Sequence, residues 1–198
     1  MQLKNHISSG NIKVPKTTAI FNMSSAHDCP SRKLGLCKAS LQGARCYALK
    51  AEYKYHPAVL PYRRRQEKIW KSTGVNDFVS QFLSLNKIKR NKYKALRFNE
   101  SGDFHSQKYV NKAELIAKKL LEYGIKCYCY TSRSDLNFNN CKYLIISGSG
   151  FKKSGVKNEF KIIGKNDKIP NGYGICAGNC RICSRCLKVG LKTVVRKH

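Results

Sequence analysis

The chain has 198 residues, which suits one domain or one domain with a small appendage. Its 39 Lys and Arg against 11 Asp and Glu give a net charge of +28, far beyond what solubility requires. Such a surplus predicts a nucleic-acid partner, DNA or RNA, rather than a membrane surface. A hydrophobic fraction of 41% argues against global disorder, and no apolar run approaches the roughly 18 residues of a membrane span. Residues 1–6 lack the apolar region of a secretory signal, so we expect a cytoplasmic protein.

Predicted strands and helices alternate along the chain from residue 17 onward. Hydrophobic runs predict short strands at 17–23, 94–98, 125–131, 143–147 and 159–163. Helical periodicity predicts helices that start near Cys46, Arg63, Thr73 and Ser106, with a short helix before the strand at 143–147. The alternation indicates parallel strands with right-handed crossovers, an α/β body over residues 1–163. Residues 164–198, rich in Gly, Lys, Asn and Cys, are expected to pack on that body as a tail.

Polar segments follow three of the predicted strands at their carboxyl ends, where parallel α/β folds bind ligands. They are the segments 100–103, 131–135 and 147–150. Glycine lets a ligand approach the backbone, and the Ser, Arg and acidic side chains can hydrogen-bond to it. The alternative is that the strands simply run into polar turns.

The tail contains four cysteines within eleven residues, Cys176, Cys180, Cys183 and Cys186. In a reducing compartment, such a set is more often metal-binding than disulfide-bonded. Four thiolates this close in sequence can converge on one metal with little loop-closure cost. Compact spacing of this kind is more typical of a [4Fe–4S] cluster than of zinc, which remains the alternative.

A second set, Cys29, Cys37 and Cys46, has only three members. Three thiolates can hold a cubane cluster and leave one iron open, as catalytic metal centres do. Alternatively, His27 or Asp28 completes a closed site, or the three cysteines are free. Cys127 and Cys129 alternate along a predicted strand, so we expect both to be buried as small hydrophobic side chains.

A family resemblance rests on the order of several motifs between residues 20 and 186. They are the segments 25–30, 97–104 and 130–134 together with Cys37, Cys46-Tyr47-Ala48 and the tail cysteines. This order resembles a phage-encoded cysteine-rich family of largely uncharacterised function. That family is in turn similar to radical S-adenosylmethionine (SAM) proteins, in which three loop cysteines hold a [4Fe–4S] cluster. The resemblance implies SAM as a ligand, with Ser101, Gly102 and Asp103 placed where such proteins hold its amine.

Basic residues are densest at 62–65, 87–94 and 188–198, and tyrosines and a tryptophan lie near the first two stretches. Such side chains can contact phosphates and stack on bases. The alternative is that these charges form solvated helix faces. The shortage of Asp and Glu favours contact with nucleic acid, and phage origin would place the protein in the host cytoplasm.

These observations combine into one prediction with two alternatives. We expect a partial parallel (β/α) barrel-like body with a cysteine-rich metal-binding tail, carrying one or two [4Fe–4S] clusters and performing redox chemistry on nucleic acid. The catalytic side chains would be Glu100, Asp103 and Arg133, and the cofactor would bind at Ser101, Gly102, Ser132 and Ser147. One alternative is a non-enzymatic, zinc-stabilised nucleic-acid-binding protein. The other is a cluster-containing nuclease that uses Glu100, Asp103, His105 and Asp135.

Overall fold

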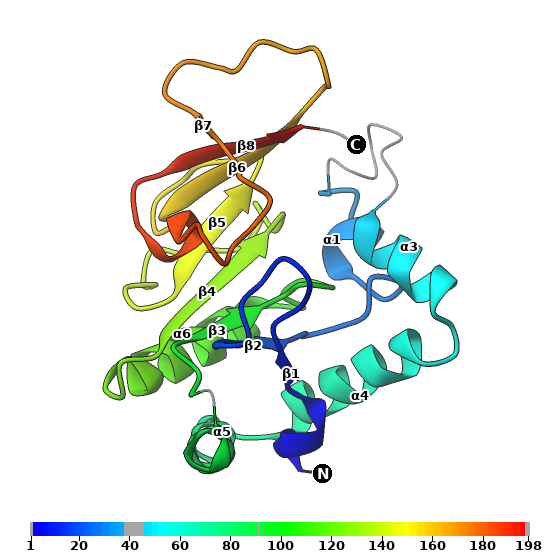
Figure 1. Ribbon diagram of the computed structural model, residues 1–198, viewed down its shortest axis with the longest axis vertical. Coiled ribbons are helices and arrows are strands. Elements are labelled where there is room, and N and C mark those ends of the chain that lie inside the picture. Colours follow the sequence, from blue (N-terminus) through cyan, green and yellow to red (C-terminus); the bar gives the residue numbers. More distant parts are fainter. Residues whose placement is uncertain (1, 38–45, 91, 197–198) are drawn as a thin grey trace.

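The computed structural model describes residues 2–37, 46–90 and 92–196 (Figure 1). Its helices are η1 (Leu3–His6), α1 (Pro30–Lys33), α3 (Tyr47–Lys54), α4 (Val59–Ser72), α5 (Val75–Ile88), α6 (Gln107–Leu121) and η2 (Arg185–Leu187). Its strands are β1 (Ser8–Ser9), β2 (Thr18–Phe21), β3 (Ala95–Phe98), β4 (Lys126–Thr131), β5 (Ile145–Ser149), β6 (Asn158–Ile163), β7 (Gly174–Ile175) and β8 (Lys192–Arg196). In these described ranges, no helix is both long and apolar enough to cross a membrane.

The strands form one eight-stranded sheet in the order β1-β2-β3-β4-β5-β6-β8-β7. Only β1 runs antiparallel to its neighbour, and every other pair is parallel. This arrangement confirms the α/β class and the parallel crossovers. The sheet is open, with β1 and β7 at its edges, so the expected barrel-like form is not confirmed.

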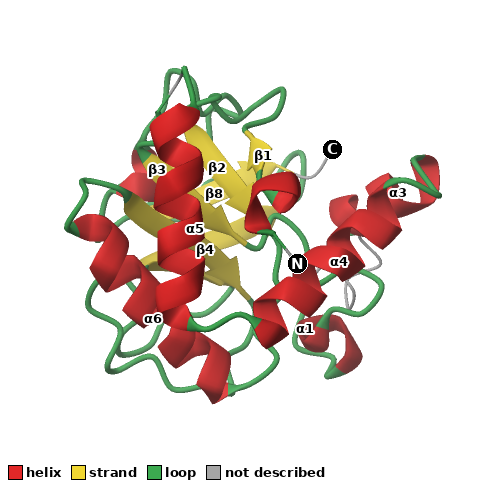
Figure 2. Cartoon of the chain, turned by 90° about the horizontal axis from the view of Figure 1, so that it is seen from below, coloured by secondary structure: helices red, strands yellow, loops and turns green. Residues whose placement is uncertain are grey.

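Helices α5 and α6 cover one face of the sheet (Figure 2). Their buried side chains, which include Phe78, Phe82, Val110 and Ile116, pack against the strands in the main hydrophobic core. Each such side chain contributes about 1.5–3 kcal/mol when fully buried. Cys127 and Cys129 belong to the same core, which confirms that both are buried as hydrophobic side chains.

The opposite face of β3, β4 and β5 carries a smaller cluster of Ala95, Tyr128 and Ile145. Cys186 and Leu187 of the C-terminal segment pack on this cluster. That segment also joins the sheet, because β8 pairs with β6 along five residues. The tail is therefore continuous with the sheet of the body, while the division at residue 163 stays a prediction.

The loop between β4 and β5 differs from the sequence-based expectation. Within the described residues it contains no helix, and β5 begins at Ile145 rather than at residue 143. The Glu114 carboxylate explains the later start, because it accepts hydrogen bonds from the backbone N–H groups of residues 142–144 at 2.7–2.9 Å. Those groups are then unavailable to the sheet. Buried Phe138 and Cys141 fill the loop with apolar packing instead of a helix.

Candidate functional site

The carboxyl ends of β2, β3 and β4 meet at one edge of the sheet, as the sequence predicts for a parallel arrangement. Asp103, in the loop after β3, is buried at the centre of this edge. Its carboxylate accepts four hydrogen bonds of 2.6–2.8 Å, from the hydroxyls of Ser31 and Thr131 and the backbone N–H groups of Ser132 and Phe104. Burial raises the pKa of Asp103, and the hydrogen bonds oppose that shift. We call these five residues the Asp103 cluster.

The Asp103 cluster joins three loops of different strands. Both carboxylate oxygens are occupied, so Asp103 has little remaining capacity to bind a ligand. The geometry favours a positioning role for Asp103 and for Ser132, whose backbone N–H is one of the four donors.

The turn after β3 has an unusual backbone conformation. Asn99 and Gly102 both have positive φ, at 59° and 74°. A Cβ atom on Gly102 would lie 2.0 Å from the Ser24 hydroxyl, so only glycine fits against that loop. The Ser101 backbone N–H donates to the Asn22 side chain at 2.8 Å, which fixes the turn to the end of β2. Gly102 and Ser101 are thus engaged in packing the loops together.

Glu52 of α3 is a buried residue of this edge that the sequence analysis missed. Its carboxylate accepts hydrogen bonds from the backbone N–H groups of Ala26 and His27 and pairs with Arg63 at 2.8 Å. The Ser101 hydroxyl lies 3.3 Å from the same carboxylate. The available signal was the position of Glu52 four residues after Ala48, on the buried side of the helix.

The other predicted catalytic and cofactor residues also have internal partners or lie buried. Arg133 forms a two-point ion pair with Asp135 at 2.7 and 2.8 Å and donates to the Phe104 carbonyl. The Glu100 side chain accepts from Asn11, and its carbonyl accepts from the Tyr47 hydroxyl. Ser147 is buried within β5. The structure therefore brings Asp103, Ser132 and Arg133 together. Their hydrogen bonds mainly connect the loop after β3 to the loop after β4.

Two of the three N-terminal cysteines, Cys29 and Cys37, lie next to Ser31 of the Asp103 cluster. Cys29 immediately precedes α1 and Cys46 immediately precedes α3, whereas residues 38–45 between them lie outside the described ranges. Burial raises the pKa of the Cys29 thiol to about 12, with smaller contributions from Asp103 and Cys37. The backbone N–H of Cys37 donates to the Ser31 carbonyl at 3.1 Å, and the Ser31 hydroxyl donates to Asp103 at 2.6 Å, so Cys37 is joined to Asp103 through Ser31.

Of the four tail cysteines, Cys186 packs on the smaller hydrophobic cluster. Cys176, Cys183 and Cys186 each act on the pKa of another tail thiol, and burial raises the pKa of Cys180 and Cys186. The Tyr130 hydroxyl lies 2.6 Å from the Cys186 sulfur. Nearby, the Arg97 guanidinium stacks on the Tyr130 ring at 5.6 Å, and its buried Nε has no hydrogen-bond partner among the residues that the structure describes. A positive group without a carboxylate partner is suited to a negatively charged thiolate site.

Across the described part of the chain, no three His, Cys, Asp or Glu side chains form a group that could hold a metal ion. The seven cysteine ligands therefore stay a prediction. Asp28, considered as a fourth ligand, is instead paired with Arg64 at 2.8 Å, which lowers its pKa to about 2.

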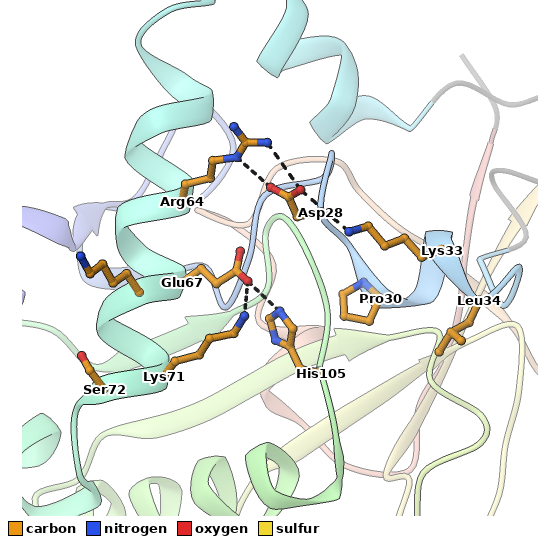
Figure 3. A pocket seen from close by; sticks show the side chains of 10 residues that line it. Asp28, Pro30, Lys33, Leu34, Arg64, Glu67, Lys71, Ser72 and His105 are labelled. Carbon is orange, nitrogen blue, oxygen red and sulfur yellow. Dashed lines mark hydrogen bonds and ion pairs between the residues drawn. The ribbon is translucent and has the colours of Figure 1, made fainter.

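A cleft of about 900 Å³ opens at the same edge, beside Cys29 (Figure 3). We call it the basic cleft; it is lined by Asp28, Pro30, Lys33, Leu34, Arg64, Glu67, Lys68, Lys71, Ser72 and His105. Asp28 lies between Arg64 and Lys33, and Glu67 lies between Lys71 and His105. The sequence analysis noted the basic run at 62–65 but not the cleft. The signal was the spacing of Arg64, Lys68 and Lys71, which places three cations on one helix face.

A comparison with protein families finds a match over three quarters of the chain. The family model described as Gene product 88 matches residues 2–149, which include the sheet edge, the N-terminal cysteines and the basic cleft. No curated protein and no solved structure matches the chain.

Proposed function

We propose that this chain, which belongs to the Gene product 88 family, is an iron–sulfur protein that acts on nucleic acid. The proposed [4Fe–4S] cluster is held by Cys29, Cys37 and Cys46. The observation that carries this proposal is the placement of Cys29 and Cys37 next to Ser31, whose hydroxyl donates to Asp103 where three strand ends meet. Ligand sites in open parallel sheets lie at this edge.

The chemistry of the donors fits such a cluster. Cysteine thiolates are the usual ligands of iron–sulfur clusters, and a bound cluster with an open iron would supply redox chemistry. In the metal-free protein the Cys29 thiol is protonated at neutral pH, since burial raises its pKa to about 12. Metal binding must therefore release that proton, so metal uptake is expected to increase with pH.

The surrounding residues position the loops of the proposed centre. Asp103 ties α1, which follows Cys29, to the end of β4. Glu52 ties α3, which follows Cys46, to the backbone at Ala26 and His27. Each of the two flanking cysteines is thereby fixed through a helix that starts at the next residue.

The tail cysteines are proposed to hold a second, closed thiolate site over Arg97 and Tyr130. Its role is structural, because it connects the 176–186 segment to the sheet face. A SAM ligand remains part of the radical-SAM proposal, but the backbone N–H groups of Ser101 and Ser132 are already bonded within the protein.

A zinc-stabilised, non-enzymatic nucleic-acid-binding protein is the second candidate. The observation that favours it is the internal engagement of Asp103 and Arg133, the residues expected to be catalytic. The nuclease alternative receives less support, because Asp135 is paired with Arg133 and His105 with Glu67.

Anaerobic purification followed by iron and sulfide assays tests the proposal. We expect absorbance near 400 nm, and Cys46→Ala should remove roughly half of the iron if two clusters are present. Cys183→Ser should remove the other half and lower the melting temperature, because metal-binding energy contributes to folding. Cys141→Ala is the matched control and should keep its iron. Zinc without iron or sulfide in the wild-type protein would replace this proposal with the second candidate.

A further inference from the structure

We propose that the basic cleft binds the phosphodiester backbone of single-stranded nucleic acid. This inference rests on the proposed function for its partner class and adds the binding surface. The first observation is the charge: Lys33, Arg64, Lys68 and Lys71 face only two carboxylates, which leaves a surplus of two positive charges in one cavity.

The cations of the cleft come from two elements that face each other. The spacing of Arg64, Lys68 and Lys71 places them on one face of α4. Lys33 of α1 points towards Asp28 from across the cleft (Figure 3). Lys68 has no hydrogen-bond or ion-pair partner among the described residues. Lys33 is 3.9 Å from Asp28 and its side chain is 63% exposed, so this pair is weak. Two ammonium groups are therefore available to phosphate oxygens.

The other two cations are held in place by acidic side chains. Arg64 is 2.8 Å from Asp28, and Lys71 is 2.6 Å from Glu67. A phosphate could accept the same hydrogen bonds from Arg64 and Lys71 that these carboxylates accept. His105 also binds Glu67, at 2.9 Å, and burial lowers the pKa of this histidine. A neutral imidazole can only donate to the carboxylate, so it adds no permanent charge to the cleft.

Exposed aromatic side chains on α3, which packs against α4, favour a single strand over a duplex or a membrane. Tyr53 in α3 and Tyr55 at its end are 69% and 54% exposed. Arg63 of α4 holds α3 through its 2.8 Å ion pair with Glu52. Exposed rings on a helix that adjoins the basic helix α4 provide stacking surfaces for unpaired bases. The lining of the cleft includes only Pro30 and Leu34 as apolar residues, which is too little for insertion into a lipid surface.

The cleft also lies beside the proposed cluster. Cys29 stands between Asp28 and Pro30, both of which line the cleft. A strand bound along α4 would therefore pass next to the N-terminal cysteines. This proximity explains why a nucleic-acid substrate and a thiolate centre would share one edge of the sheet.

The test is fluorescence anisotropy with a labelled oligothymidylate across a salt series. The variant Lys33→Gln/Lys68→Gln should bind at least about tenfold more weakly at low salt. Its plot of log affinity against log salt should flatten by about 1.4, at roughly 0.7 for each lost phosphate contact with a single strand. Neither lysine has a buried partner, so the variant should remain folded.

The matched control is Lys119→Gln/Lys126→Gln, which makes the same charge change at the amino ends of the strands. Lys119 lies exposed in the last turn of α6, and exposed Lys126 begins β4. The control should keep near wild-type affinity and salt slope. Equal losses in both variants, or an unchanged cleft variant, would overturn the cleft as the binding surface while leaving the proposed function in place.

Two further measurements decide the partner. Tyr53→Ala/Tyr55→Ala should weaken oligothymidylate binding without changing the salt slope, because stacking releases no counterions. Tighter binding to the matching duplex or to anionic vesicles would overturn the single-strand assignment. No binding by the wild-type protein at about 50 mM salt would overturn both this inference and the nucleic-acid part of the proposed function.

Discussion

The Asp103 cluster and the basic cleft are neighbouring groups of polar residues with opposite properties. In the cluster, one buried carboxylate meets four donors and no polar atom of Asp103 is left for a ligand. In the cleft, the charges are partly exposed, and the cations outnumber the carboxylates. A polar residue where ligands commonly bind can therefore stabilise the scaffold, whereas surplus exposed charge indicates a partner.

The largest expected effect comes from opening the cluster. Asp103→Ala removes the acceptor of four buried donors, so we expect a loss of roughly 3–5 kcal/mol in the free energy of unfolding. Urea unfolding measures this loss. Asp103→Asn keeps one acceptor oxygen and should be less destabilising. A stable Asp103→Ala protein that has lost only ligand binding would show that Asp103 binds a ligand and does not serve the scaffold.

An intermediate effect is expected at the turn that carries the cluster. Gly102→Ala combines a positive φ with a Cβ position 2.0 Å from the Ser24 hydroxyl, so it should cost roughly 3 kcal/mol. Gly124→Ala is the control: it has a similar φ of 72° but open space around the Cβ. Conformation alone should cost about 1 kcal/mol there. Equal melting temperatures for the two variants would show that the turn is not tightly packed.

The smallest effect is expected from the pH dependence of an ion pair in the cleft. The hydrogen bond from Arg64 is the main cause that lowers the pKa of Asp28, to about 2. A depressed folded-state pKa contributes stability above the ordinary value near 4, and this contribution is lost as pH falls towards 2. Because the pair is partly exposed, the contribution should be under about 1 kcal/mol. Comparing the unfolding of Asp28→Asn and wild type at pH 6 and pH 2 should show a difference only at pH 6.

Local sequence patterns predicted most of the elements but not their functional context. The strands β2, β3, β4 and β6 and the helices α5 and α6 lie within a residue or two of expectation, because their apolar periodicity reflects burial in one core. The start of β5 was displaced by Glu114, which is remote in sequence. Such contacts leave no periodic signal.

The sequence predicted where the candidate site lies but not what each of its residues does. The carboxyl ends of three strands do meet, which follows from parallel topology. That Asp103 would be saturated by donors depends on Ser31 and Thr131, which come from other loops. The partnership of Glu52 with Arg63 likewise requires the packing of α3 on α4. The basic cleft forms because α1 lies next to α4, and the pattern of a single helix cannot predict that contact.

The order of the last three strands of the sheet, β6-β8-β7, affects how this part of the sheet assembles. β7 precedes β8 in the chain but joins the sheet only through it, because β8 pairs with β6 on one side and β7 on the other. β7 must therefore wait for a later segment before its backbone is paired. The tail cysteines lie in the connection between these two strands, so a metal bound there would shorten the search that brings them together. A metal bound by the tail cysteines would therefore affect the rate at which β7 and β8 pair, separately from the stability of the pair once it has formed.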